Sequence, residues 1–212
     1  MSTTPLRTEA VPLSRERLVD EALRVVDAEG FAALSLRAVA RRLSVTPMAL
    51  YRYVESSSEL ADLVVSRIVE ERLEDTRWPS EPRECLRVLA TTVVDLIRVH
   101  PVLLEAYQRG GVLTPPAMRA VDTVLAALYA GGLDPDRAMS AYVAVHCYAL
   151  GFAALVTDIG EPRQRETPKP EDYPALATHF DAWLTMRTDA RFRAGLELVL
   201  DGALGPVAER ST

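Results

Sequence analysis

Apolar residues recur along this chain with a period near 3.6 residues, and the strict alternation typical of strands is absent from the sequence. The first two apolar stripes consist of Leu18, Ala22, Val25 and Val26, and of Leu36, Val39, Ala40 and Leu43. They predict one helix from Ser14 to Glu29, followed by Gly30, and a second, short helix that begins after Ser35. The same period continues toward the C-terminus, so we predict an all-α protein.

A third short helix is predicted where Thr46 can act as the N-cap and Pro47 can occupy the first helical position, and we expect it to reach about Tyr53. Two short helices separated by about three residues form a helix-turn-helix. The spacing of Ser56 and Glu59 then matches a capping box, which predicts the start of a fourth helix.

Five or six further helices are predicted beyond Trp78, because the helical period persists between breaks at 100–101, 110–111 and 131–132. The stretch from Thr157 to Pro170 is polar and rich in proline, and we interpret it as a mobile loop. The last helix, from Asp189 to about Leu204, carries Gly195, which would allow a neighbouring helix to approach closely. We therefore divide the chain into a flexible arm (1–13), a helix-turn-helix domain (14–60) and a larger C-terminal helical domain (61–212).

Charge is distributed unevenly between these parts. The whole chain has a net charge of −6, but residues 1–54 carry eight Arg against six acidic residues, and residues 31–54 carry four Arg and no acidic residue. Because phosphate binding requires only a local positive face, this pattern is compatible with nucleic-acid binding by the N-terminal domain.

Other kinds of chemistry find little support in the sequence. The three histidines are scattered, and Cys85 and Cys147 lie inside apolar helical patterns, so we expect buried thiols, no metal site and no cofactor. Residues 1–13 do not have the apolar run of a signal peptide, and we expect no membrane-spanning segment later in the chain. The protein is accordingly expected to be cytosolic.

Residues 31–54, FAALSLRAVARRLSVTPMALYRYV, together with the chain from Leu13 and the helix of Leu60, resemble the DNA-binding domain of the TetR family. Residues 191–204, RFRAGLELVLDGAL, resemble the closing helix of the tetracycline-repressor type of C-terminal domain. The sequence departs from the family pattern at Ser44, where glycine is common in the turn, at Tyr53, where histidine is common, and at Ser57, where lysine often contacts phosphate.

The resemblance implies a set of DNA contacts. The start of the third helix would face the major groove, Arg37 would read a base from the second helix, and Tyr51 would contact phosphate. The full set that we predict to contact DNA is Ser35, Arg37, Thr46, Pro47, Met48, Ala49, Tyr51, Arg52, Tyr53 and Ser57. Arg41 and Arg42 could equally form a solvated face.

The resemblance also implies a homodimer formed by the last long helices and a ligand pocket between the connecting helices. For the dimer interface we predict Val145, Ala149, Phe192, Leu196, Val199 and Leu200. For the pocket we predict Leu89, Val93, Leu104, Tyr107, Met118, Val121, Leu125, Tyr142, His146 and Phe152, although apolar residues at helical spacing can also be ordinary core. The metal-binding histidines of the tetracycline repressor correspond to Tyr107 and Leu73, which argues against magnesium-tetracycline as the ligand.

The function that the resemblance implies is a repressor that binds a palindromic DNA operator as a homodimer and is released by a small apolar or aromatic effector. The alternatives are a TetR-like activator and a ligand-independent DNA-binding protein. From a different class, the C-terminal helices could form a helical small-molecule-binding enzyme, but no nucleophile–base pair, acidic dyad or phosphate-binding loop is apparent in the sequence, so we do not expect an enzyme.

Overall fold

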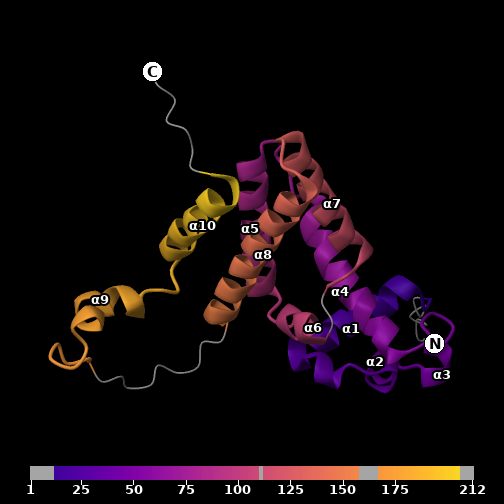
Figure 1. Ribbon diagram of the computed structural model, residues 1–212. Coiled ribbons are helices and arrows are strands. Elements are labelled where there is room, and N and C mark those ends of the chain that lie inside the picture. The colour runs from indigo at the N-terminus through magenta and orange to yellow at the C-terminus, as the bar shows by residue number, and fades with distance from the viewer. Residues whose placement is uncertain (1–11, 110–111, 158–166, 206–212) are drawn as a thin grey trace, which may run out of the picture. The chain divides into compact units, whose positions relative to one another are not determined.

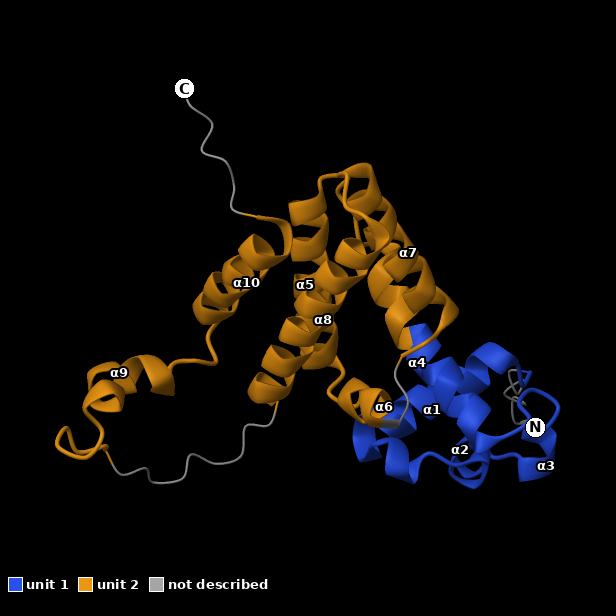
Figure 2. Ribbon diagram, viewed as in Figure 1, with its two compact units in different colours: residues 1–67 blue, residues 68–212 orange. Residues whose placement is uncertain are grey.

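The computed structural model describes residues 12–109, 112–157 and 167–205, and in these ranges all regular structure is helical (Figure 1). The predicted arm (1–13) lies almost entirely outside the described residues, as does most of the predicted loop (157–170), whose first residue, Thr157, ends a helix. The chain forms two compact units, residues 1–67 and 68–212 (Figure 2).

Unit 1 contains the predicted helix-turn-helix. Its elements are α1 (Arg15–Glu29), a 3₁₀ turn η1 (Phe31–Ala33), α2 (Leu36–Leu43), α3 (Pro47–Leu50) and the first part of α4 (Ser57–Glu74). The Ser14 and Ser35 side chains cap α1 and α2 by accepting hydrogen bonds from the backbone N–H groups of Arg17 and Ala38, both at 3.1 Å. The predicted apolar stripes of α1 and α2 are buried, as expected.

The third helix is shorter than predicted. After Leu50 the backbone N–H of Tyr53 bonds to the carbonyl of Leu50 at 2.8 Å, an i to i+3 bond that tightens the chain into a turn. Glu59 accepts a hydrogen bond at 2.6 Å from the backbone N–H of Glu55, while its own N–H donates to Ser56 Oγ at 3.1 Å. The cap of α4 is thus close to the predicted capping box. The difference is that the Glu59 carboxylate binds the N–H of Glu55, one residue before Ser56.

The turn between α2 and α3 depends on Ser44, which has φ 57° and ψ 38° and is the only non-glycine described residue with a positive φ. The N–H of Ser44 bonds to the carbonyl of Arg41 at 3.2 Å, and that of Val45 bonds to Ala40 at 3.0 Å. This pair of bonds is a Schellman motif, in which the residue after the helix takes the left-handed conformation. Serine therefore adopts here a conformation that glycine would adopt with less strain.

In its described residues, unit 2 contains the end of α4 and six further helices. These are α5 (Pro82–Val99), α6 (Leu103–Arg109), α7 (Pro115–Ala130), α8 (Pro135–Thr157), α9 (Pro174–Leu184) and α10 (Asp189–Leu204). Helix α8 packs against α5, α7 and α10, and α5 also packs against α7 and α10. Helix α9 buries none of its residues and exposes apolar side chains, including Leu176 and Leu184.

Close packing of α8 on α10 uses Gly195, as the sequence predicted. A Cβ atom at this position would collide with the ring and hydroxyl of Tyr148 on α8. The Tyr148 hydroxyl donates a hydrogen bond at 2.9 Å to the backbone carbonyl of Phe192 on α10. The absence of a side chain at Gly195 is therefore what lets the tyrosine reach the backbone of α10.

One expectation about α8 was wrong. Cys147 is a free thiol as expected but is exposed, whereas Cys85 on α5 is buried and its burial raises the pKa of its thiol. Helix α8 is also long and apolar enough to cross a membrane by length and composition alone, as the core helices of other proteins can be. Its contacts with α5, α7 and α10 cover only part of this apolar surface, since 28% of its most apolar window is buried.

Candidate nucleic-acid interface and ligand cavity

The exposed surface of α3 is the candidate nucleic-acid interface. Met48 is 73% exposed and Tyr51 is 52% exposed, and they are the only large hydrophobic residues of unit 1 that are exposed among its described residues. Leu50, which lies between them in sequence, is completely buried and anchors the helix. Thr46 and Pro47 are exposed as well, and Ala49 is half-buried. The short helix thus presents the residues that were predicted to face a groove.

The arginines of unit 1 differ in their surroundings. Arg37 on α2 and Arg52 after α3 are exposed, as is Arg41. Arg42 instead forms an ion pair with Glu21 of α1 at 2.6 Å, with Glu29 at 3.7 Å, and its guanidinium is the main reason why the pKa of Glu21 is lowered. Of the two arginines that could have formed a solvated face, Arg42 fixes α1 to α2 and Arg41 remains available to a ligand.

The polar residues predicted to contact phosphate also differ. The Tyr53 hydroxyl donates its hydrogen to the backbone carbonyl of Leu13 at 2.7 Å, so it cannot donate that hydrogen to a phosphate. We correct its assignment from DNA contact to a structural role. Ser35 Oγ accepts a hydrogen bond from the helix backbone, which leaves its own hydrogen available, and Ser57 is exposed at the start of α4.

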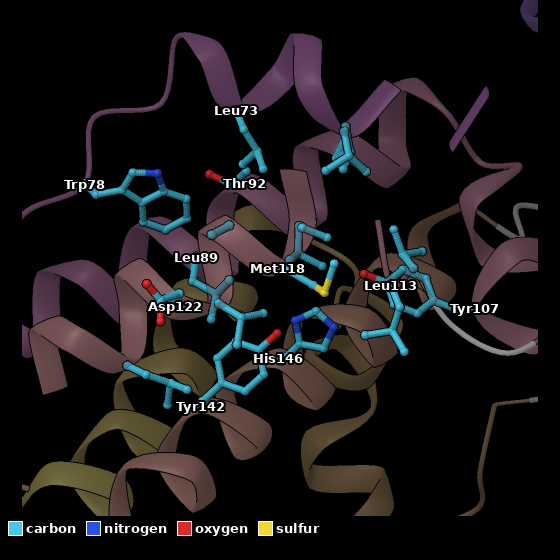
Figure 3. A pocket seen from close by; sticks show the side chains of 18 residues that line it. Leu73, Trp78, Leu89, Thr92, Tyr107, Leu113, Met118, Asp122, Tyr142 and His146 are labelled. Carbon is cyan, nitrogen blue, oxygen red and sulfur yellow. The ribbon is translucent and has the colours of Figure 1, made fainter. Parts of the chain in front are cut away.

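Unit 2 contains a cavity of about 490 Å³ (Figure 3). Its walls come from the last turns of α4, from Trp78, from α5, α6, α7 and α8, and from the segment before α7. Eight of the ten residues predicted for a pocket line it: Leu89, Val93, Tyr107, Met118, Val121, Leu125, Tyr142 and His146. A volume of this size is typical of sites for small organic molecules.

Two pocket predictions were wrong. Phe152 is 7% exposed and packs against Phe192 of α10 with ring centroids 4.9 Å apart, so it belongs to the core between α8 and α10. Leu104 is half-buried on α6 and does not line the cavity. Helical spacing puts Phe152 on an apolar stripe but does not say which neighbour that stripe contacts.

Other wall residues were not predicted, namely Val69, Leu73, Trp78, Thr92, Leu96, Val112, Leu113, Ala117, Ala120 and Asp122. Five of the ten, on α5 and α7, lie within three residues of predicted residues on the same helices. Trp78 and Leu73 come from the end of α4 and the linker after it, where the sequence pattern gave no indication of a pocket. Leu73 could have been predicted in one way only. Leu73 and Tyr107 correspond to the metal-binding histidines of the tetracycline repressor, and both residues line the cavity.

An aromatic cluster forms one end of the cavity. The His146 ring lies 5.4 Å from the Tyr142 ring at an interplanar angle of 21°, and 5.8 Å from the Tyr107 ring at 59° (Figure 3). Burial lowers the pKa of His146, since removal from water disfavours the charged imidazolium. Burial also raises the pKa of Tyr142, and it raises the pKa of Tyr107 to about 12. All three side chains are therefore neutral near pH 7.

The predicted dimer-interface residues lie mostly inside the protomer. Phe192 is 5% exposed, and Val145, Ala149, Leu196 and Leu200 are at most 1% exposed. Helices α5, α8 and α10 of one chain cover these five side chains, and their part in a dimer interface stays a prediction. Only Val199 keeps a partly exposed side chain.

A different apolar stripe of α8 is exposed. Its members follow at intervals of four residues and are Met139, Val143, Cys147, Gly151 and Leu155. On α10, Leu198 is 75% exposed, and Gly202 is exposed with open space beside it. The sequence pattern missed this stripe because α8 is apolar around most of its circumference.

An exposed helix-turn-helix joined to a helical unit that contains a cavity is the architecture of a helix-turn-helix DNA-binding regulator. Matches to the sequence profiles of known families identify the family of this regulator. Residues 18–62 match the bacterial regulatory proteins of the tetR family, and residues 78–205 match the tetracyclin repressor-like C-terminal domain. The chain belongs to the TetR family of bacterial transcriptional regulators.

Individual relatives agree with this assignment. The chain is 31% identical to the HTH-type transcriptional repressor DrrR1 of Streptomyces coeruleorubidus over 97% of this chain and 83% of that protein. It is 27% identical to SCO7222, a TetR from Streptomyces coelicolor. The two structures superpose with a TM-score of 0.70, over 91% of this chain and 98% of that one. ActR of the same organism, in complex with actinorhodin, has a TM-score of 0.78 at 24% identity, over 95% of this chain and all of that one, and shares the fold.

Proposed function

We propose that this TetR-family protein is a repressor that binds a palindromic DNA site as a homodimer and is released from it by a small, mostly apolar effector. The observation that carries the proposal is that a chain with an exposed recognition helix also contains a cavity of about 490 Å³ with mainly apolar walls. DNA binding of this kind takes place in the cytoplasm.

DNA recognition would rest on the exposed residues of α2, α3 and the start of α4. The first residues of α3 would enter the major groove, where Met48 and Ala49 can contact thymine methyl groups. Arg37 has the exposure and charge for a bidentate contact to guanine, and Tyr51, Arg52, Ser35 and Ser57 would contact phosphates. Tyr53 is not included, because its hydroxyl hydrogen is donated to Leu13.

Dimerisation would use the second apolar face of α8 together with α10. The exposed stripe from Met139 to Leu155 has the four-residue spacing of a helix-packing ridge, and Leu198 is an exposed apolar residue of α10, which packs against α8. Gly151 and Gly202 have open space where a Cβ would stand, which allows another helix to approach closely. An isologous pairing of these faces would place two recognition helices on one palindrome.

Helix α4 is the element through which the cavity could influence DNA binding. Its Leu60 and Val64 are completely buried in unit 1, and its Val69 and Leu73 line the cavity in unit 2. Ion pairs fix the second part of α4 to its neighbours, from Arg72 to Asp95 of α5 and from Glu70 to Arg119 of α7, both at 3.4 Å. A ligand that binds better to one position of α4 would shift the population toward that position. ActR, which has the same fold, binds actinorhodin, so this fold can hold a ligand.

The test is fluorescence-anisotropy titration of DNA flanking the gene of this protein, in a salt series, with wild type and Arg37→Ala. We expect a dimer to bind one palindromic site, and Arg37→Ala to lose about 1–3 kcal/mol of discrimination between this site and random DNA. Arg24→Ala, which removes an exposed arginine of α1 that pairs with Glu21, is the matched control. Equal, weak binding to all sequences would refute a site-specific repressor.

An activator or a ligand-independent DNA-binding protein would give the same DNA titration, and they are distinguished by adding ligand. A compound that occupies the cavity should weaken operator binding if the protein is an inducible repressor. Unchanged operator affinity with the cavity saturated would favour the ligand-independent alternative. A helical enzyme is not proposed, because no group of described residues in the cavity forms a nucleophile–base pair.

A further inference from the structure

The cavity contains a small number of polar groups that are not used by the fold. His146 Nδ1 is buried without a hydrogen-bond partner, and it is the only such side-chain atom among the described residues. Nε2, at the other side of the ring, is not buried in this way and is the nitrogen of His146 that is open to the cavity. No hydrogen bond between described residues uses the hydroxyl of Tyr107 or Tyr142. These three groups are available to a ligand.

The tautomer of His146 follows from its surroundings. A neutral imidazole carries its hydrogen on one nitrogen only. A hydrogen on Nδ1 would be a buried donor without an acceptor, which is rarer and more costly than a buried acceptor without a donor. The hydrogen therefore belongs on Nε2, so His146 presents an N–H donor to the cavity. Tyr107 and Tyr142, which keep their phenolic hydrogens, add two further donors.

The charge of the walls limits the ligand further. Among the described residues no lysine or arginine lines the cavity, and Asp122, the one carboxylate among them that does, is exposed. A permanently charged ligand would lose its hydration here without gaining a buried partner of opposite charge. The site is therefore suited to a neutral molecule with hydrogen-bond acceptors.

Aromatic rings favour a flat ligand. Trp78 and Tyr107 lie at opposite ends of the view in Figure 3, and His146 and Tyr142 are stacked on each other. Such rings gain additional attraction from offset contacts with another planar ring system. The remaining walls are aliphatic, with Met118 as an adaptable side chain.

We propose that the effector is a flat, fused-ring aromatic ketone or quinone, whose carbonyl oxygen accepts a hydrogen bond from His146 Nε2–H beside the hydroxyls of Tyr107 and Tyr142. This inference rests on the proposed ligand-binding function of the cavity. It assigns His146 as the residue that selects a carbonyl compound over a hydrocarbon of the same shape.

The experiment compares fluorenone with fluorene, which share a three-ring frame and differ in a carbonyl against a methylene group. Binding to the full chain is measured by equilibrium dialysis without DNA. We expect fluorenone to bind about tenfold more tightly, the value of roughly one hydrogen bond. His146→Phe should reduce this ratio to about one and leave the affinity for fluorene within about twofold, because the ring is kept and the donor is lost.

Further variants make the result decisive. His146→Gln keeps an N–H near the position of Nε2 and should restore part of the preference, and His146→Met is a second variant without a donor should His146→Phe fail to fold. His179→Phe, the same substitution at an exposed histidine of α9, should leave both affinities unchanged. Three results would overturn the proposal: equal binding of the two compounds to wild type, binding of neither, or an unchanged preference in the variants that have no donor at position 146.

The failure of this inference and that of the proposed function are separable. Selective binding of fluorenone that does not change operator affinity would remove the release mechanism and leave the ligand assignment intact. If fluorene and fluorenone release the protein from the operator with equal potency, the release mechanism stands and the ligand assignment fails.

Discussion

The hydroxyl of Tyr53 donates a hydrogen bond at 2.7 Å to the backbone carbonyl of Leu13, across 40 residues of sequence. The bond fixes the segment before α1 to the turn after α3, and the guanidinium of Arg52 lies 6.0 Å from the centre of the same ring. A side chain that we predicted from sequence to contact DNA thus stabilises the domain in this chain.

Removing that hydroxyl should affect stability more than DNA binding. For Tyr53→Phe we expect a loss of about 0.5–1.5 kcal/mol in the unfolding free energy of unit 1, the value of one hydrogen bond, with operator affinity changed less than about twofold. Tyr51→Phe, which removes an exposed hydroxyl, should show the opposite pattern. Thermal unfolding and anisotropy titration of both variants measure the two effects. A larger loss of DNA affinity in Tyr53→Phe than in Tyr51→Phe would return Tyr53 to the interface.

Replacing Ser44 by glycine should stabilise the helix-turn-helix. The left-handed conformation costs a residue with a Cβ about 1–2 kcal/mol, and part of this gain is offset by the greater entropy of glycine in the unfolded chain, so we expect a net gain of about 0.5–1 kcal/mol. Ser44→Val should destabilise the turn, since a β-branched residue tolerates this conformation poorly. Amide hydrogen exchange over residues 36–50 measures both changes locally. Slower exchange in the valine variant than in wild type would contradict the argument.

Charges placed on the second apolar face of α8 and α10 should prevent dimerisation. For Val143→Glu combined with Leu198→Glu we expect the dimer dissociation constant to rise at least about 100-fold, because the carboxylates would be desolvated in the interface. Val99→Glu, at another exposed valine, which ends α5, is the matched control and should remain a dimer. Sedimentation velocity gives the association state. An unchanged dimer in the double variant would place the interface elsewhere.

Acid should weaken unit 2 through His146. The pKa of this histidine is lowered in the folded protein by burial, so its contribution to stability is complete above the ordinary value of 6.5 and is lost as the pH falls below it toward the folded-state pKa. In that window one histidine contributes a slope of up to about 1.4 kcal/mol per pH unit. Tyr107 from α6 and Tyr142 on α8, the groups that face it, are neutral throughout this range.

Urea unfolding at about pH 7.5 and about pH 5.5, compared between wild type and His146→Phe, isolates this contribution. The wild type should lose more stability between the two pH values than the variant does. His179→Phe, which keeps the buried histidine, should follow the wild type. If wild type and His146→Phe respond equally to pH, His146 titrates as it would in water.

Local sequence determined the helices of unit 1 and most of their ends, although α3 ends earlier than predicted. The caps at Ser14 and Ser35, the proline at the start of α3 and the buried stripes of α1 and α2 follow from interactions within a few residues, which sequence alone specifies. The family motif added the identity of the exposed residues on α3. Eight of the 18 residues of the cavity wall were also predicted from sequence, because a pocket between helices draws on one stripe of each.

Only the tertiary structure decided which neighbour each apolar face contacts. Helix α8 has three such faces, carrying Tyr142 and His146 toward the cavity, Val145 and Ala149 into the core, and Val143 and Leu155 toward solvent. Hydrophobicity has no direction, so a helix that is apolar on every side gives no sign of which stripe meets α5, which meets α10 and which is left for a partner. The hydrogen bond of Tyr53 and the ion pairs of Arg42 were equally invisible, since their partners are set by the packing of segments distant in sequence.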